Sequence, residues 1–267
     1  MLSPQAQKIL YDYLNLPFTG ITGVRCPYFN NARLKQRAQL KVLTGKGKPE
    51  EIVEEAKIIS LQYHAGLFDK GGHCCLHNEH TGEKVTPEQI RKFLVDHNLG
   101  VECSGFVTQI LRAHFKETKN IDIARKFFIV SPKRFLRWLI SKIRPIENIG
   151  VRIWANDLNT KKINWQEVEA GDVIVILEVS IPTKHNHILL ITENNNGVIK
   201  YAHARAWSSE GKYGHGVAEG VIRITHPAGG LLDQEWEELG KVGVGNETFA
   251  EAKSAKVLET RRANLDF

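Results

Sequence analysis

The sequence predicts an α+β fold, with helices in the first half of the chain and a small antiparallel sheet in the second. Two observations give this prediction. In the first half, apolar residues recur at helical spacing, as in "FVTQILRAHF" at residues 106–115. From Trp165 onward, short runs rich in Val and Ile are separated by Gly, Asn and Pro, which is typical of strands joined by turns.

Composition and charge narrow the class of protein. The 267 residues are 42% hydrophobic and 25% charged, which is ordinary for a globular protein with a core. A net charge of +6 favours acidic ligands, but the excess is too small to indicate a nucleic-acid partner. No apolar run approaches the roughly 20 residues that span a bilayer, and the first residues lack the features of a signal peptide. We therefore expect a cytoplasmic protein.

The helices of the first half are predicted from periodicity and capping. Thr86 and Gln89 match a capping box that opens a helix through Leu94. The basic segment 131–145 fits either a helix on a membrane surface or an ordinary helix whose Lys and Arg side chains are solvated. The other expected helices cover residues 4–14, 31–43 and 48–63.

The sheet of the second half is predicted from four runs, at residues 172–177, 187–192, 198–204 and 220–225. "ENNNG" at 193–197 has the composition of a hairpin turn between the second and third runs. Beyond residue 226 the pattern weakens, and residues 246–263 fit either a terminal helix or a helix that leads into a last strand.

A cysteine begins one of the apolar helices. In "GVECSGFVTQILRAHF", residues 100–115, Cys103 lies in the first turn, where unpaired backbone N–H groups and the helix dipole favour a thiolate. The alternative is a small, inert core cysteine. The four cysteines of the chain have no disulfide-framework spacing, so we expect reduced thiols.

Two histidines on adjacent predicted strands provide a base and a group to orient it. If "NNN" is the hairpin loop, Glu193 pairs with Gly197, and His187 lies directly opposite His203 on the same face. If the loop is one residue longer, the two rings point to opposite faces.

These segments resemble the NlpC family of papain-like cysteine peptidases. "ECSGFV" at 102–107 is similar to the family's Asp-Cys-Ser-Gly-Phe-Val signature, and "EAGDVIVI", "NHILLIT" and "YAHA" resemble the strands that follow it, in the same order. Glu102 stands where the family has Asp, and Leu189 where it has Gly. The resemblance implies a papain-like NlpC-type fold, with the nucleophile helix packed on the sheet.

The resemblance also assigns roles. It implies Cys103 as nucleophile, His187 as general base and acid, and His203 as the residue that orients His187, with the Cys103 N–H in an oxyanion hole. Ser104 and Glu102 are placed on the oxyanion or substrate side of the site. Tyr28 is a candidate for the family's missing upstream tyrosine, and its alternative is a buried tyrosine near a turn.

The function implied is cleavage of an amide bond in a bacterial cell-wall peptide, without cofactor or metal. The expected partner is an acidic peptide or peptidoglycan fragment. Two alternatives stay open: a catalytically silent module that binds peptide or glycan, and a membrane-associated acyltransferase or lipid hydrolase. The corresponding domains are a helical extension at 1–99, a catalytic core at 100–226 with a helical insertion near 120–145, and a C-terminal extension at 227–267.

One further segment contains zinc-competent side chains, but its spacing matches no standard structural site, so a polar loop is the expected structure. These side chains are His73, Cys74, Cys75, His77 and His80.

Overall fold

The computed structural model describes the chain except for residues 30–40, 69–84, 130–142, 181–183 and 266–267. The chain divides into two compact units. Unit 1 comprises Met1–Gln7, Cys103–His203 and Ala218–Phe267, and unit 2 comprises Lys8–Glu102 and Ala204–Val217. This division differs from the sequence-based one, because residues close to both chain ends belong to the same unit as Cys103.

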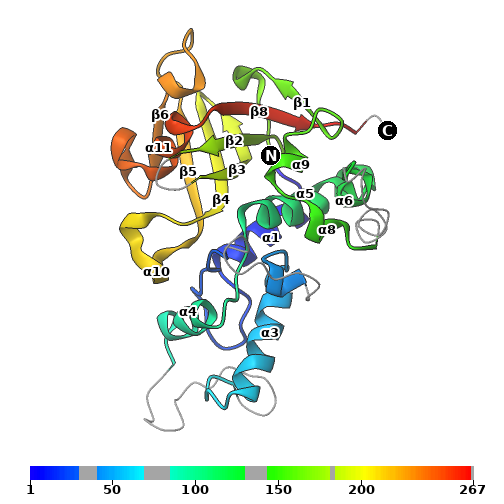
Figure 1. Ribbon diagram of the computed structural model, residues 1–267, viewed down its shortest axis with the longest axis vertical. Coiled ribbons are helices and arrows are strands. Elements are labelled where there is room, and N and C mark those ends of the chain that lie inside the picture. The colour runs from blue at the N-terminus through cyan, green and yellow to red at the C-terminus, as the bar shows by residue number, and fades with distance from the viewer. Residues whose placement is uncertain (30–40, 69–84, 130–142, 181–183, 266–267) are drawn as a thin grey trace. The chain divides into compact units, whose positions relative to one another are not determined.

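The strands of the described residues form one antiparallel sheet in the order β1-β8-β2-β3-β4-β5-β6-β7 (Figure 1). The α+β class is therefore confirmed, and the four predicted strands correspond to β2 to β5. The strands are β1 (Thr160–Ile163), β2 (Val173–Val179), β3 (His185–Asn195), β4 (Val198–Arg205), β5 (Gly216–Arg223), β6 (Glu235–Glu238), β7 (Lys241–Val242) and β8 (Val257–Ala263).

Strand β8 lies between β1 and β2, although it is the last strand in the chain. Its sequence "VLETRRA" is polar, and it can lie inside the sheet because the guanidinium of buried Arg261 has hydrogen-bond partners there. The Nε of Arg261 donates to Thr160 Oγ1 at 2.8 Å, and the guanidinium forms an ion pair with Glu259. Residues 227–267, expected as an extension, thus supply an internal strand of the sheet.

The helices predicted at residues 4–14, 48–63 and 87–94 are confirmed. At the start of α4, Thr86 Oγ1 accepts from the Gln89 N–H at 3.2 Å, and Gln89 Oε1 accepts from the Thr86 N–H at 2.8 Å, as in a capping box. The helices are α1 (Pro4–Leu14), α3 (Pro49–Gln62), α4 (Pro87–Asp96), α5 (Cys103–Lys119), α6 (Ile123–Lys126), α8 (Pro145–Asn148), α9 (Val151–Trp154), α10 (Gly211–Gly214) and α11 (Glu247–Ser254).

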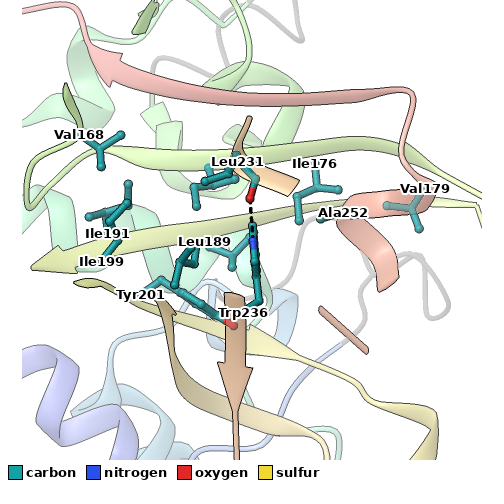
Figure 2. Close-up of a cluster of buried hydrophobic side chains, with 12 residues drawn as sticks. Val168, Ile176, Val179, Leu189, Ile191, Ile199, Tyr201, Leu231, Trp236 and Ala252 are labelled. Atoms are coloured by element: carbon teal, nitrogen blue, oxygen red, sulfur yellow. Dashed lines mark hydrogen bonds between the residues drawn. The ribbon is translucent and has the colours of Figure 1, made fainter. Parts of the chain in front are cut away.

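A hydrophobic core of unit 1 gathers around Trp236 of β6 (Figure 2). The indole Nε1 of Trp236 donates to the Leu231 carbonyl at 3.0 Å, which satisfies the polar atom of a fully buried ring. We call this set of side chains the Trp236 cluster. Its members are Val168, Ile174, Ile176, Val179, Leu189, Ile191, Ile199, Tyr201, Ile222, Leu231, Trp236 and Ala252.

Within unit 2, the guanidinium of Arg91 on α4 joins separate segments of the chain. It donates to the carbonyls of Arg25, Tyr213 and His215 at 2.5, 2.9 and 2.5 Å. Burial lowers the pKa of Arg91 to about 10. These bonds attach residues 204–217 to the helical segment that precedes Cys103 in the chain.

Several predictions concern residues outside the described ranges. They are most of the helix at 31–43, most of the basic helix at 131–145, and the zinc-competent segment 73–80. Within the described ranges, none of the helices combines the length and the apolar character that crossing a bilayer requires.

Candidate functional site

Cys103 is the first residue of α5, as the sequence predicts. Its side chain is buried, with 6% of its surface exposed. The backbone N–H groups of a first helical turn have no acceptor within the helix, and they favour a negative charge beside them. Among the described residues Cys26 is the other free cysteine, and burial raises its pKa to about 12. The position of Cys103 therefore suits a thiolate, whereas that of Cys26 opposes one.

Helix α5 packs against β3 and is fixed by buried hydrogen bonds. Thr108 Oγ1 donates to the Ser104 carbonyl at 2.6 Å and accepts from Trp154 Nε1 at 3.1 Å. Ser104, a candidate for the oxyanion or substrate side, is itself buried beside Cys103. Cys103, the first residue of α5, therefore belongs to a helix that is held in place by its neighbours.

The hairpin between β3 and β4 has a two-residue turn. Asn196 and Gly197 both have positive φ, 49° and 77°, as in the turn type that suits a twisted hairpin. Pairing begins with Asn195 opposite Val198. The prediction of a three-residue loop, with Glu193 opposite Gly197, is therefore wrong.

A bulge at Thr192 brings the two histidine side chains onto the same face of the sheet. The turn alone would set His203 opposite Leu190, whose side chain points to the other face of β3 from that of His187. The bulge shifts the register by one residue, so that His203 lies opposite Leu189 instead. The sequence-based register placed His187 directly opposite His203. In the structure the two residues are instead diagonal neighbours on the same face.

The two imidazoles are joined by a hydrogen bond. Nε2 of His187 and Nδ1 of His203 are 2.7 Å apart, and the ring planes meet at 60°. Both side chains are buried, with 4% and 0% of their surfaces exposed. The structure thus brings together two of the three predicted catalytic residues, and it identifies the ring atom that each uses.

A carboxylate that sequence reasoning missed completes this group. Glu238 Oε2 lies 3.0 Å from His203 Nε2, 3.1 Å from Tyr201 Oη and 3.0 Å from Thr248 Oγ1. Glu238 is two residues after Trp236 on β6, so the two side chains share a face of the strand. This spacing within "EWEE" was the available signal that Glu238 is buried. We call His187, His203 and Glu238 the histidine–glutamate chain.

The histidine–glutamate chain lies on the same face of the sheet as the Trp236 cluster. Side chains two residues apart share a face, and His187 also pairs with Ile176 of that cluster. Leu189, where the NlpC family has Gly, belongs to the cluster as well. Within the described part of the chain, no side chain of α5 is a member of it.

Two further candidates, Glu102 and Tyr28, belong to unit 2. The Glu102 carboxylate forms an ion pair with buried Lys46, and its N–H donates to the Gly45 carbonyl at 3.0 Å. Tyr28 is half-buried and pairs with Val101 in an isolated bridge. Both residues therefore take part in the fold of unit 2.

Across the described residues, no group of three or more His, Cys, Asp or Glu side chains is arranged to hold a metal ion. Comparisons with models of protein families, with curated proteins and with solved structures gave no match. Function is therefore inferred from the side chains and their geometry.

Proposed function

We propose that this protein is a cysteine hydrolase that cleaves an amide bond, with Cys103 as nucleophile and His187 as base. The observation that favours it most is the bond between His187 Nε2 and His203 Nδ1. An imidazole held through Nε2 presents Nδ1 as its remaining basic atom, so a second residue already fixes the orientation that catalysis needs. The resemblance to the papain-like NlpC family assigns the same roles to these residues.

The reaction has two stages. His187 Nδ1 takes the proton of Cys103, and the sulfur attacks the carbonyl carbon to give a tetrahedral oxyanion, to which the Cys103 N–H donates. His187 then protonates the leaving amine as the C–N bond breaks, which leaves a thioester on Cys103. Water, deprotonated by His187, attacks the thioester, and the acid and the thiol are released.

We propose a cell-wall peptide as the substrate, with the scissile amide next to an acidic residue. The net charge of +6 suits an acidic ligand, and the family that the sequence resembles acts on such peptides. No bound ligand, cofactor or metal is required by this chemistry.

A catalytically silent binding module is the second candidate, and one observation favours it. The histidine–glutamate chain is buried and joined by two hydrogen bonds, so it would stabilise the sheet even if Cys103 took no part. The remaining alternative is a membrane-associated acyltransferase or lipid hydrolase. Its support is the basic segment 131–145, most of which lies outside the described residues.

Hydrolysis of defined peptides distinguishes these candidates. The purified protein is incubated with muropeptides that contain a γ-D-glutamyl amide, and the released amine is measured. We expect turnover that falls by at least about a thousandfold in Cys103→Ala and is unchanged in the matched Cys26→Ala variant. Equal turnover by Cys103→Ala would exclude this nucleophile. Peptide binding without turnover by the wild type would favour the silent module.

A further inference from the structure

We propose that Glu238 is a positioning residue that sets the protonation state of both imidazoles, so that His187 Nδ1 is the proton acceptor for Cys103. This inference rests on the proposed function, and it adds a residue for which the family resemblance gives no role. Glu238 lies in the segment 227–267, which the sequence assigned outside the catalytic core.

The carboxylate of Glu238 acts as an acceptor. Its side chain is 0% exposed, and Oε2 lies within 3.1 Å of the hydroxyls of Tyr201 and Thr248 as well as of His203 Nε2. Hydrogen bonds from hydroxyl donors favour the ionised form of a buried carboxyl, which can only accept. The oxygen that faces His203 is therefore an acceptor, and His203 Nε2 must supply the hydrogen.

The protonation of the two rings follows from this contact. A neutral imidazole has one N–H, so a His203 ring protonated at Nε2 has an accepting Nδ1. That atom is 2.7 Å from His187 Nε2, which must then be the donor. His187 is left without a hydrogen on Nδ1, which is the state that a base needs to take the proton of a thiol.

The negative charge also favours the transferred proton. When His187 takes the Cys103 proton at Nδ1, the ring becomes an imidazolium, and its Nε2–H still donates to His203. His203 stays neutral, and its Nε2–H still donates to Glu238. No proton needs to reach the carboxylate, whose charge stabilises the imidazolium across the intervening His203 ring in a buried site.

The carboxylate is placed by three elements. Glu238 is the last residue of β6, Tyr201 and His203 are on β4, and Thr248 is in the first turn of α11. The turn after Glu238 has two residues with positive φ, Leu239 at 52° and Gly240 at 73°. The fold thus places the Glu238 side chain of β6 against the His203 ring of β4, two strands away in the sheet.

The direct test is the tautomer of each ring in the wild-type protein. Long-range ¹H–¹⁵N correlation spectra of ¹⁵N-histidine-labelled protein distinguish Nδ1–H from Nε2–H imidazoles, and His187→Gln and His203→Gln assign the signals. We expect both rings as Nε2–H tautomers at neutral pH. A His187 ring protonated at Nδ1 would overturn the inference, whatever the outcome of the hydrolysis assay.

A variant tests the charge separately from the tautomer. In Glu238→Gln, the hydroxyls of Tyr201 and Thr248 hold the amide oxygen toward His203, so the acceptor stays while the charge is lost. We expect alkylation of Cys103 near neutral pH to fall about tenfold, with its pH profile moved to higher pH. The control is Glu237→Gln, which removes the charge of a partly exposed carboxylate on the same strand and should leave the profile in place.

The outcomes are separable from those of the proposed function. An activated Cys103 in the wild type with an unchanged profile in folded Glu238→Gln would overturn the role of Glu238 alone. An ordinary Cys103 in the wild type would overturn the hydrolase, and the tautomer spectra would still test the protonation of the rings. If Glu238→Gln does not fold, those spectra decide the inference.

Discussion

At the scale of single residues, His203 is held through both of its ring nitrogens. Nδ1 contacts His187 at 2.7 Å and Nε2 contacts Glu238 at 3.0 Å, and the ring is fully buried. Removal of one partner from such a group leaves the others without compensation for their lost contact with water. The same residue is therefore a stabilising contact and, in the proposed mechanism, an orienting group.

We expect His203→Ala to lower the free energy of unfolding by about 3 kcal/mol, because it leaves a buried carboxylate without one of its donors. Urea denaturation measures this loss. The control is His226→Ala, because the His226 side chain is exposed, and its effect should stay within about 0.5 kcal/mol. Equal effects of the two substitutions would contradict the described network.

Sequence reasoning selected Cys103, His187 and His203 as candidates because each stands in a segment of strong periodicity. Glu238 was missed for a physical reason. In "EWEE" the side chains of Glu235 and Glu237 are partly exposed whereas Glu238 is buried on the face of Trp236, but this spacing alone does not show what would accompany a buried carboxylate. Only the distant partners Tyr201 and Thr248 make burial of that carboxylate favourable.

At the scale of elements, the β3–β4 hairpin decides which face the histidines share. Two local features act together, the tight turn at Asn196–Gly197 and the bulge at Thr192. The composition of "ENNNG" predicts a turn but not its length, and a bulge leaves no mark in a run such as "HILLIT". The common face was therefore predicted, but by way of a wrong register.

We expect Gly197→Ala to destabilise the protein by about 1–2 kcal/mol, because φ is 77° there and the added methyl group meets no neighbouring atom. The effect is then one of backbone conformation alone. Asn196→Gly is the matched control, since glycine adopts positive φ freely, and it should be neutral or slightly stabilising. Thermal unfolding compares them, and a neutral Gly197→Ala would contradict the turn geometry.

The end of α5 is fixed by a second local contact. The Arg112 guanidinium donates to both carboxylate oxygens of Asp122, at 2.8 and 2.7 Å, and Asp122 also caps α6 by accepting from the Ala124 N–H. The hydrogen bond from Arg112 is the main cause that lowers the pKa of Asp122. Because the folded state depresses this pKa, the stabilisation is present above the ordinary carboxyl pKa and is lost as the pH falls through the depressed value.

We expect Asp122→Ala to lower the free energy of unfolding by about 1–2 kcal/mol at neutral pH, through loss of the cap and the ion pair. The difference from the wild type should shrink at acid pH, as Asp122 becomes protonated. Arg125→Ala is the control, because this exposed side chain lies 3.9 Å from Asp122 and should contribute little. A difference independent of pH, measured by denaturation, would contradict this assignment.

At the scale of the whole molecule, the strands that sequence reasoning missed or left undecided are polar ones, β6 and β8 among them. Runs of Val and Ile correctly predicted β2 to β5, whereas "VLETRRA" and "EWEE" contain charged residues whose burial depends on partners far away in the chain. Long-range pairing also explains why the units differ from the sequence-based division at residue 226. Strand β8 belongs beside β1 and β2, which a local pattern does not reveal.

We expect deletion of residues 256–267, which removes β8, to abolish cooperative unfolding, because in the described sheet β1 loses its neighbouring strand and β2 loses one of its two. Denaturation monitored by near-UV circular dichroism tests this. Arg261→Ala in the full-length chain should weaken the fold without abolishing it. A truncated protein that unfolds as cooperatively as the full chain would show that residues 256–267 are a dispensable extension after all.

The most direct test of the central claim, that His187 activates Cys103, is the pH dependence of iodoacetamide labelling mapped by peptide mass spectrometry. We predict that Cys103 reacts near pH ~6, below the range of an ordinary thiol. Cys26, whose pKa burial raises to about 12, should stay unlabelled there and serve as an internal reference. In His187→Ala the reactivity of Cys103 should fall. Labelling of Cys103 that follows an ordinary thiol, or that is the same in His187→Ala, would contradict the account.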